Sequence, residues 1–200
     1  MTLSNEGRAQ NKTYVCHRSD GHRSLNPPQQ LDAQTLSVKT NTLYWLTASP
    51  NISVEAGIAP RWTVEVSGGL NPFTFKENTK WKHYLIQGEG RYWLCERFYG
   101  HFIGLHIGGG EFNTGHISFP WPGLDKQFRY DGWNIKAGVS YGYTFIIGGR
   151  WNLEATLGLG ISHASYGRFS YEPCGDLIER RSRTAFVPTK AGVTFVYMIR

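Results

Sequence analysis

Apolar and polar residues alternate along two long segments in the C-terminal half of the chain. Between residues 151 and 161 every odd-numbered position is apolar, and every even-numbered position is polar or glycine. The segment 133–145 has the same alternation, and Gly148 and Gly149 lie between the two segments. A period of two is typical of a strand that buries one face, and a glycine pair is typical of a tight hairpin. The two segments therefore predict an antiparallel pair of strands.

A weaker form of the same pattern predicts six more strands, at about 36–47, 51–58, 61–71, 82–94, 98–110 and 185–199. Short turns near Ala59, Cys95 and Gly148 alternate with longer links at about 72–81, 112–129 and 167–184. This alternation is typical of bacterial outer-membrane barrels. We expect an all-β fold, a closed antiparallel up-and-down transmembrane barrel of about eight strands over 36–200. Residues 1–35 are polar and are expected to form a mobile N-terminal arm.

Alternation alone does not say whether the apolar face meets lipid or a ligand cavity, because a soluble lipocalin-like barrel has the same period with the opposite sense. Glycine and small residues on the polar face fit the narrow interior of a small barrel. Strand parity also predicts an interior network with four charges of each sign, as a buried set requires. Its expected members are Lys39, Glu55, Glu65, Glu89, Arg91, Lys136, Glu154 and Lys190.

Aromatic residues lie near both ends of the apolar face. Trp133 and Tyr143 share this face ten residues apart. At ~3.3 Å per residue and a tilt of about 40°, they are separated by roughly 25 Å along the barrel axis, the usual height of the apolar band. We therefore expect lipid outside, a location in the bacterial outer membrane, and outer-membrane lipid and lipopolysaccharide as partners.

The net charge of +6 is dispersed along the chain, so no nucleic-acid partner is expected. The densest cluster, 179–183, is interpreted as a solvated loop, with a contact to lipopolysaccharide phosphate as the alternative. No run of about 18 apolar residues predicts a membrane-spanning helix. The first ten residues lack the apolar stretch of an export signal, so we expect that the printed start is either that of a mature protein or misplaced.

Three cysteines do not form a metal motif, and an odd number leaves at least one of them unpaired within the chain. The expected topology puts Cys16 in the arm and Cys95 in a short turn on the same side of the membrane. Cys174 falls in a long link on the opposite side. A disulfide requires Cα atoms within about 7 Å, so Cys174 is not expected to pair with Cys95, whereas pairing of Cys16 with Cys95 is left open.

His163 and Ser165 are the strongest candidates for chemistry. Both have outward parity near one end of their strand, where a histidine is close enough to activate a serine hydroxyl. The pattern is similar to that of outer-membrane lipid A deacylases, but Glu179 is the only acid near enough to orient His163, and Tyr166 follows the serine in place of asparagine. We expect no catalytic site, and His163 with Ser165 is kept as the alternative.

The remaining histidines show no metal-binding spacing. Parity directs His83 and His106 inward and His101 outward, while His116 falls in a link. Neither a metal nor another cofactor is therefore expected.

Nine short segments carry a resemblance to a known family. The most distinctive are Trp81-Lys-His-Tyr-Leu-Ile-Gln87, Gly90-Arg-Tyr-Trp-Leu-Cys-Glu96 and Gly100-His-Phe-Ile-Gly-Leu-His106, joined by 37–41, 69–75, 132–133, 140–143, 151–154 and 188–190. They resemble a family of unknown function, small outer-membrane β-barrel proteins from Bacteroides-type bacteria that are sometimes encoded near fimbrial genes. The resemblance implies an outer-membrane location and an envelope or fimbrial protein as partner, and it carries no catalytic residue.

The expected function is that of a non-catalytic outer-membrane barrel that presents extracellular loops, with a structural, recognition or envelope-assembly role. Two alternatives remain: a lipid A-type deacylase that uses His163 and Ser165, and a soluble lipocalin-like ligand-binding barrel.

Overall fold

The computed structural model describes residues 35–71, 80–115, 128–170 and 177–199. The expected arm 1–35, apart from Thr35, and the central parts of the three expected long links lie outside these residues. The described elements are β1 (Leu36–Asn41), α1 (Thr42–Leu46), β2 (Asn51–Ala59), β3 (Trp62–Asn71), β4 (Lys80–Trp93), β5 (Gly100–Gly115), β6 (Phe128–Gly148), β7 (Trp151–Ser170) and β8 (Leu177–Ile199).

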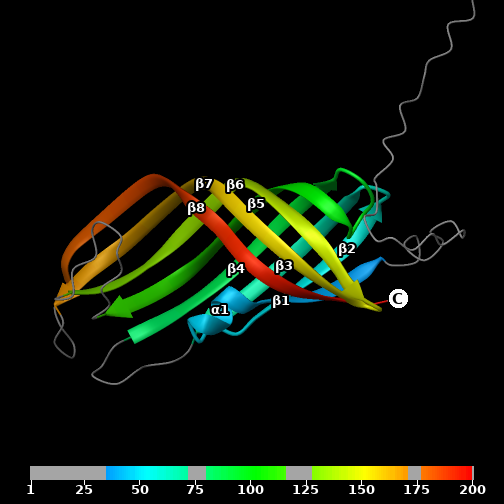
Figure 1. The fold of residues 1–200 in the computed structure, drawn as a ribbon. Coiled ribbons are helices and arrows are strands. Elements are labelled where there is room, and N and C mark those ends of the chain that lie inside the picture. Colours follow the sequence, from blue (N-terminus) through cyan, green and yellow to red (C-terminus); the bar gives the residue numbers. More distant parts are fainter. Residues whose placement is uncertain (1–34, 72–79, 116–127, 171–176, 200) are drawn as a thin grey trace, which may run out of the picture.

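Each strand pairs antiparallel with the next in sequence, and β8 pairs with β1 to close a barrel (Figure 1). This confirms the expected all-β fold of eight antiparallel strands. The stagger of the barrel follows from tracing paired residues around the ring. Starting at Val38 and passing from partner to partner through β2 to β7, the trace reaches Phe186 on β8. Val38 itself pairs directly with Tyr197, which lies 11 residues further along β8. A stagger of this size goes with strands that tilt by about 35–45° from the barrel axis.

The strands are very unequal in length. β1 has 6 residues and β3 has 10, whereas β6, β7 and β8 have 21, 20 and 23. As a result, β5 to β8 continue well past the short strands at the end away from the C-terminus (Figure 1). The expected boundaries are wrong here. Most of the expected link 167–184 belongs to β7 and β8, which remain paired as far as Phe169 on β7 and Leu177 on β8. Both faces of this extension carry polar residues, so no apolar alternation marks it in the sequence.

The expected strand 36–47 is also wrong in its second half, where the chain forms the short helix α1. The side chain of Asn41 caps this helix by accepting a hydrogen bond from the backbone N–H of Leu43 at 3.1 Å. Asn41 also donates to the carbonyl of Ala191 at 3.0 Å, and Thr42 donates to that of Val193 at 2.8 Å. These contacts hold α1 against β8, where β1 has ended.

The tight turn at Gly148 and Gly149 is confirmed, with φ angles of 150° and 57° that favour glycine. The part of the chain that the structure describes contains no helix with the length and apolar character needed to cross a bilayer.

Burial is inverted relative to an ordinary soluble domain. Among the described residues, 18 polar or charged side chains are buried but only six hydrophobic ones, while 31 large hydrophobic side chains are exposed. Side chains alternate between the two faces of a strand, so one face of each strand fills the barrel and the other forms its outer wall. The polar face lies inside and the apolar face outside, which is the sense that the sequence predicts.

Candidate functional site

Seven of the eight residues expected in the interior charge network meet inside the barrel. Three cations and four carboxylates form one connected set of ion pairs, contributed by seven residues: Lys39, Glu55, Glu65, Glu89, Arg91, Glu154 and Lys190. Their side chains are at most 5% exposed, apart from Lys190 at 14%. The network therefore crosses the barrel from wall to wall, since its members come from six different strands.

Arg91 is the centre of this network. Its guanidinium lies 3.1 Å from Glu55, 2.7 Å from Glu65, 3.3 Å from Glu89 and 3.0 Å from Glu154. A buried guanidinium is stabilised only when opposite charges and acceptors surround it, and here carboxylates from four strands do so.

Two lysines complete the network on either side of Arg91. Lys39 contacts Glu154 at 2.7 Å and Glu65 at 3.1 Å, and also pairs with Glu55. Lys190 contacts Glu65 at 3.1 Å and pairs with Glu89. Hydroxyl groups satisfy further carboxylate oxygens, as with Ser140, which donates to Glu89 at 2.5 Å. The short side chains on the interior face make room: a Cβ at Gly104 would lie 2.3 Å from Glu89 Oε1.

Lys136 is the expected member that stands apart. Its ammonium group donates to the carbonyl oxygen of Thr189 at 2.9 Å and makes no ion pair with a described residue. The cations next to Glu154 are Lys39 and Arg91, not those on the two strands that flank it. Parity finds the face on which a charge lies, but strands that are not direct neighbours, here β1 and β4, supply the partners of Glu154.

An apolar plug fills the barrel between the network and the end that carries the C-terminus. It consists of Trp93, Phe98, Phe102, Val196 and Met198, all buried. The Arg91 guanidinium lies 4.4 Å from the centre of the Phe102 ring, so the plug packs directly against the network. Trp93 Nε1 donates to Thr63 Oγ1 at 2.9 Å. The plug and the network therefore form one contiguous set of buried side chains inside the barrel.

A small cavity lies on the other side of the network, toward α1. Its volume is about 40 Å³, and its walls include Tyr44, Asn51, Glu65, Gln87 and Lys190. A polar cavity of this size has room for about one or two water molecules. A lipocalin-like ligand requires an apolar cavity several times larger.

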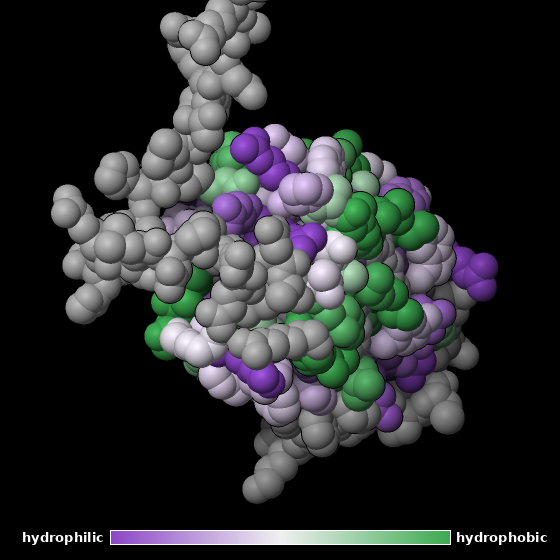
Figure 2. Space-filling model, turned by 90° about the vertical axis from the view of Figure 1, so that its right-hand side faces the viewer, coloured by the Kyte–Doolittle hydropathy of each residue, from purple (hydrophilic) through white to green (hydrophobic). Residues whose placement is uncertain are grey.

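The outer wall is a continuous apolar surface. Leu105, Ile107, Leu157, Ile161 and Phe186 are each more than half exposed, and they come from β5, β7 and β8. Seen from the end that carries the C-terminus, hydrophobic side chains form several patches between more polar ones on the visible surface (Figure 2). We name this surface the apolar belt. Exposed apolar surface of this extent is unusual for a soluble monomer.

Aromatic side chains lie along both edges of the apolar belt. At the C-terminal end, Trp62 packs against Tyr92 with ring centres 5.1 Å apart, and Trp151 against Tyr197 at 4.9 Å. At the other end, Trp133 packs against His163 at 5.8 Å. Paired aromatic edges of this kind suit the two interfaces of a bilayer.

His163 and Ser165 both lie on the outer face, as expected, but no acidic side chain among the described residues is bonded to His163. His163 Nδ1 hydrogen-bonds Thr184 Oγ1 at 2.7 Å, so a hydroxyl occupies the position where a deacylase needs a carboxylate. Glu179 is five positions from Thr184 and pairs with Arg181 at 2.8 Å, which lowers the pKa of its carboxyl. No hydrogen bond joins His163 to Ser165 in the structure.

The other histidines are dispersed. His106 is buried and bonds Thr189 Oγ1 at 2.8 Å, His83 faces Ser49 at 3.4 Å, and His101 bonds the Tyr141 hydroxyl on the outer face at 2.6 Å. Within the residues that the structure describes, no group of three potential ligands could hold a metal ion. His116 lies outside those residues.

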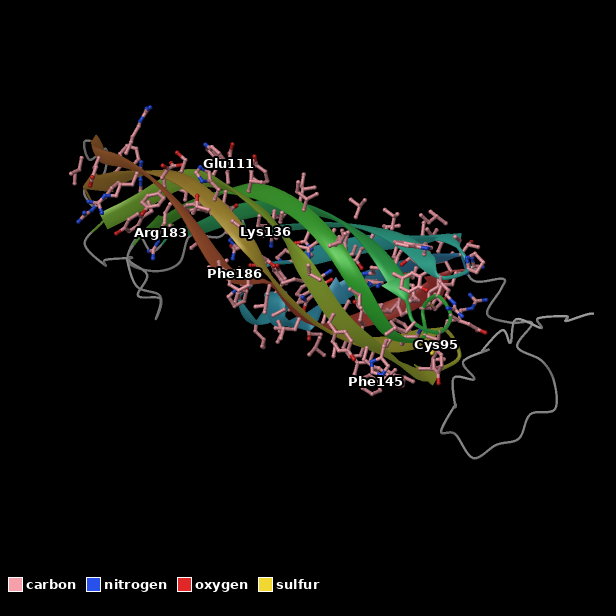
Figure 3. The ribbon with its side chains drawn as sticks, turned by 90° about the horizontal axis from the view of Figure 1, so that it is seen from above. Cys95, Glu111, Lys136, Phe145, Arg183 and Phe186 are labelled. Carbon is pink, nitrogen blue, oxygen red and sulfur yellow. The ribbon has the colours of Figure 1, made fainter. Side chains whose placement is uncertain are left out.

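Cys95 lies in the turn between β4 and β5 and is disulfide-bonded. Its partner, like both Cys16 and Cys174, lies outside the described residues. Figure 3 shows Cys95 at one end of the barrel and Arg183 toward the other.

Eight strands closed into a barrel with a charged interior and an apolar outer wall define the structural class of this protein. Residues 24–199 match the model of a family described as Protein of unknown function (DUF3575). The chain belongs to this family. No curated protein and no solved structure matches it. The expected membership in a family of unknown function is confirmed, while the link to Bacteroides-type bacteria and fimbrial genes stays a prediction.

Sequence reasoning missed the apolar plug. Trp93 shares strand parity with Glu89 and Arg91, so strand parity was a signal that could have placed it inside. Val196 and Met198 likewise share parity with the buried Thr194.

Proposed function

We propose that the protein is a non-catalytic barrel of the bacterial outer membrane with a structural, recognition or envelope-assembly role. The observation that carries this proposal is the inverted distribution of side chains, with the buried network of Arg91 inside and the apolar belt outside. In water, the exposed apolar belt would be strongly unfavourable, whereas contact with lipid chains removes this apolar surface from water. The aromatic edges then lie at the two bilayer interfaces.

The long extensions of β5 to β8 would stand outside the cell, and both termini would lie in the periplasm. The connections at the C-terminal end are short, as in the hairpin at Gly148 and Gly149, which matches the periplasmic turns of such barrels. Outer-membrane lipid and lipopolysaccharide are the proposed surroundings of the apolar belt. An envelope or fimbrial protein is the proposed class of partner.

The non-catalytic assignment rests on Thr184. A serine hydrolase needs a base that is itself oriented by a third group, and a threonine hydroxyl does not stabilise the imidazolium as a carboxylate does. The charged network and the apolar plug occupy the interior where a lipocalin-like carrier would need an apolar ligand cavity. The larger hollow of about 440 Å³ lies at the other end of the barrel, and charged and polar residues such as Lys82, Glu111 and Asp131 are among its walls.

The first experiment is electrophoresis of the protein extracted from outer-membrane fractions. We expect that extraction requires detergent and that the unboiled protein migrates as a compact species distinct from the boiled one. Recovery as a soluble monomer without detergent would contradict the membrane assignment. The mass of lipid A from the same cells tests catalysis: we expect it unchanged, and loss of one acyl chain that Ser165→Ala abolishes would restore the deacylase alternative.

A further inference from the structure

A hollow of about 440 Å³ lies toward the end of the barrel that carries the strand extensions. Its walls come from β3, β4, β5 and β6, and Figure 3 shows one of its residues, Glu111, on the same half of the barrel as Arg183. No member of the interior charge network or of the apolar plug is among these walls. The volume falls within the range of about 300–1,000 Å³ that is typical of sites for small molecules.

The register of the sheet puts the polar walls of the hollow in two rows across the strands. Lys82 pairs with Asn113, which pairs in turn with Asp131. Closer to the network by one step of the same face, Tyr84 pairs with Glu111. Directly paired residues project on the same side of a sheet, and so do residues two positions apart on one strand. The two rows therefore gather one ammonium group, one amide, one phenol and two carboxylates on the outer face.

A glycine fixes the spacing of β4 and β5 next to these rows. A Cβ at Gly110 would lie 1.9 Å from the carbonyl oxygen of Tyr84, so no larger residue fits there without a shift of the backbone. Glu111 and Asn113 follow Gly110 directly along β5. The close approach of the two strands thus sets where these two side chains stand relative to Tyr84.

The amide of Asn113 is held in one orientation. Its Nδ2 donates to Asp131 Oδ2 at 2.9 Å, and a carboxylate only accepts, so the amide oxygen is turned away from Asp131. That oxygen, Asn113 Oδ1, is buried and accepts no hydrogen bond from the described residues. Buried carbonyl oxygens normally accept at least one hydrogen bond. The hollow therefore suits a ligand that brings a donor to this oxygen.

The charges around the hollow determine which ligands suit it. Glu111 and Asp131 outnumber Lys82, and all three side chains are exposed. A phosphate or another anion would meet a wall that is negative overall, and Lys82 in turn opposes a strongly cationic peptide. A ligand rich in hydroxyl groups fits both signs, because each hydroxyl can donate to a carboxylate or to Asn113 Oδ1 and accept from Lys82.

An aromatic ring supplies the apolar part of the site. Tyr84 is 47% exposed, and its hydroxyl forms a hydrogen bond with the Glu111 carboxylate, which holds the ring at the wall of the hollow. The C–H face of a sugar ring packs well on such a ring, while the hydroxyls at its rim reach polar groups. Glu111 also pairs with Trp133, so the hollow adjoins the aromatic edge of the apolar belt.

We propose that this hollow binds a saccharide that is neutral or carries an amino group. Asn113, Asp131 and Glu111 accept hydrogen bonds from its hydroxyls, and the Tyr84 ring packs against its C–H face. The chemistry of the site does not depend on a membrane, whereas its access from outside the cell rests on the proposed function. Such a sugar has two sources: the lipopolysaccharide around the barrel, or a glycan from elsewhere.

The test uses the full chain in detergent and a panel of short oligosaccharides of glucosamine, N-acetylglucosamine, galactose and mannose, with binding measured by calorimetry. We expect saturable binding of at least one of them. Asp131→Asn and Asn113→Leu should each weaken it by roughly tenfold or more, since each removes a hydrogen bond to the ligand. Glu96→Gln also removes one exposed carboxylate, but in the turn at the other end of the barrel, and it should bind like the parent chain.

Polysaccharide released by mild acid from the lipopolysaccharide of the same cells separates the two sources. Displacement of the bound oligosaccharide would identify a lipopolysaccharide sugar as the ligand, and no displacement would identify a glycan from elsewhere.

Three results would overturn the proposal: no binding of any sugar of the panel, equal binding by the parent and Asn113→Leu, or binding of a lysine-rich peptide that the sugars do not displace. Each variant is checked on unboiled gels, so that loss of the fold is distinguished from loss of the site. Sugar binding by a protein that is soluble without detergent would contradict the membrane assignment alone.

Discussion

At the scale of single residues, Arg91 is the buried charge with the largest number of ion-pair partners among the described residues. It is fully buried, and four carboxylates lie within 3.3 Å of its guanidinium. The guanidinium group presents several donors in a fixed plane, so one side chain can face carboxylates from different strands at once. The ion pairs of the network thus connect strands that are not neighbours in the sheet and stabilise the closed barrel.

Arg91→Leu should therefore be strongly destabilising. It leaves four buried carboxylates with only Lys39 and Lys190, and loss of one partner of a buried pair costs on the order of 3–5 kcal/mol. Urea titration in lipid vesicles measures the free energy of unfolding. Arg181→Leu is the control, because its pair with Glu179 is exposed to solvent and contributes little to stability. Equal stabilities of the two variants would show that the network is dispensable.

At the scale of the strand, β7 shows how one segment serves two environments. Its even-numbered residues fill the barrel with Asn152, Glu154 and Thr156, and its odd-numbered residues contribute Leu157 and Ile161 to the apolar belt. Past His163 both faces become polar, although β7 continues to Ser170. The apolar belt therefore ends at the aromatic edge, while the hydrogen-bonded sheet does not.

Leu157→Arg tests the apolar belt. Leu157 lies midway between the aromatic edges at Trp151 and His163, and it is 59% exposed. An arginine at the bilayer midplane costs about 2–4 kcal/mol, but about 0–1 kcal/mol near an interface. Ser182→Arg, which lies past the belt, is the matched control. Unfolding in vesicles should separate the two variants by at least about 2 kcal/mol, and identical stabilities would contradict burial of the belt in lipid.

At the scale of the whole molecule, the closed ring and the long extensions give the barrel two different ends. The hairpin of β6 and β7, the turn that contains Cys95 and the end of β8 lie together at one end. The extensions, with Arg183 among them, lie toward the other (Figure 3). In the proposed membrane orientation, these two ends face different compartments.

The disulfide of Cys95 supplies the topological test. β7 runs 20 residues from Trp151 to Ser170, about 65 Å along the strand. The four residues from Ser170 to Cys174 span at most about 14 Å, so Cys174 cannot come within bonding distance of Cys95. We expect Cys16→Ser, and not Cys174→Ser, to release a free Cys95 thiol, detected by alkylation and mass spectrometry.

Whole cells give the second half of this test. A membrane-impermeant thiol reagent should modify Cys174 and, in Cys16→Ser, should spare Cys95 until the envelope is permeabilised. Modification of Cys95 in intact cells, with Cys174 protected, would reverse the orientation of the barrel and place the extensions of β5 to β8 in the periplasm.

The sequence by itself determined the class of fold, the number of strands and the face on which the eight charges of the expected interior network lie. Alternation with a period of two is a local property, so 133–145 and 151–161 are recognisable without any knowledge of their partners. The helix Thr42–Leu46 was missed because its start depends on a single capping side chain, Asn41. The polar extensions were missed because strands with two solvated faces carry no alternation.

Only the tertiary structure decided which charges meet. Glu154 faces Lys39 and Arg91 because the closed, staggered ring brings opposite walls within the reach of a side chain, and the stagger is a sum of pairings around all eight strands. The overhang of β8 beyond β1 has the same origin. β1 ends after six residues while its neighbour has 23, and this difference is a property of two strands together that neither sequence segment contains.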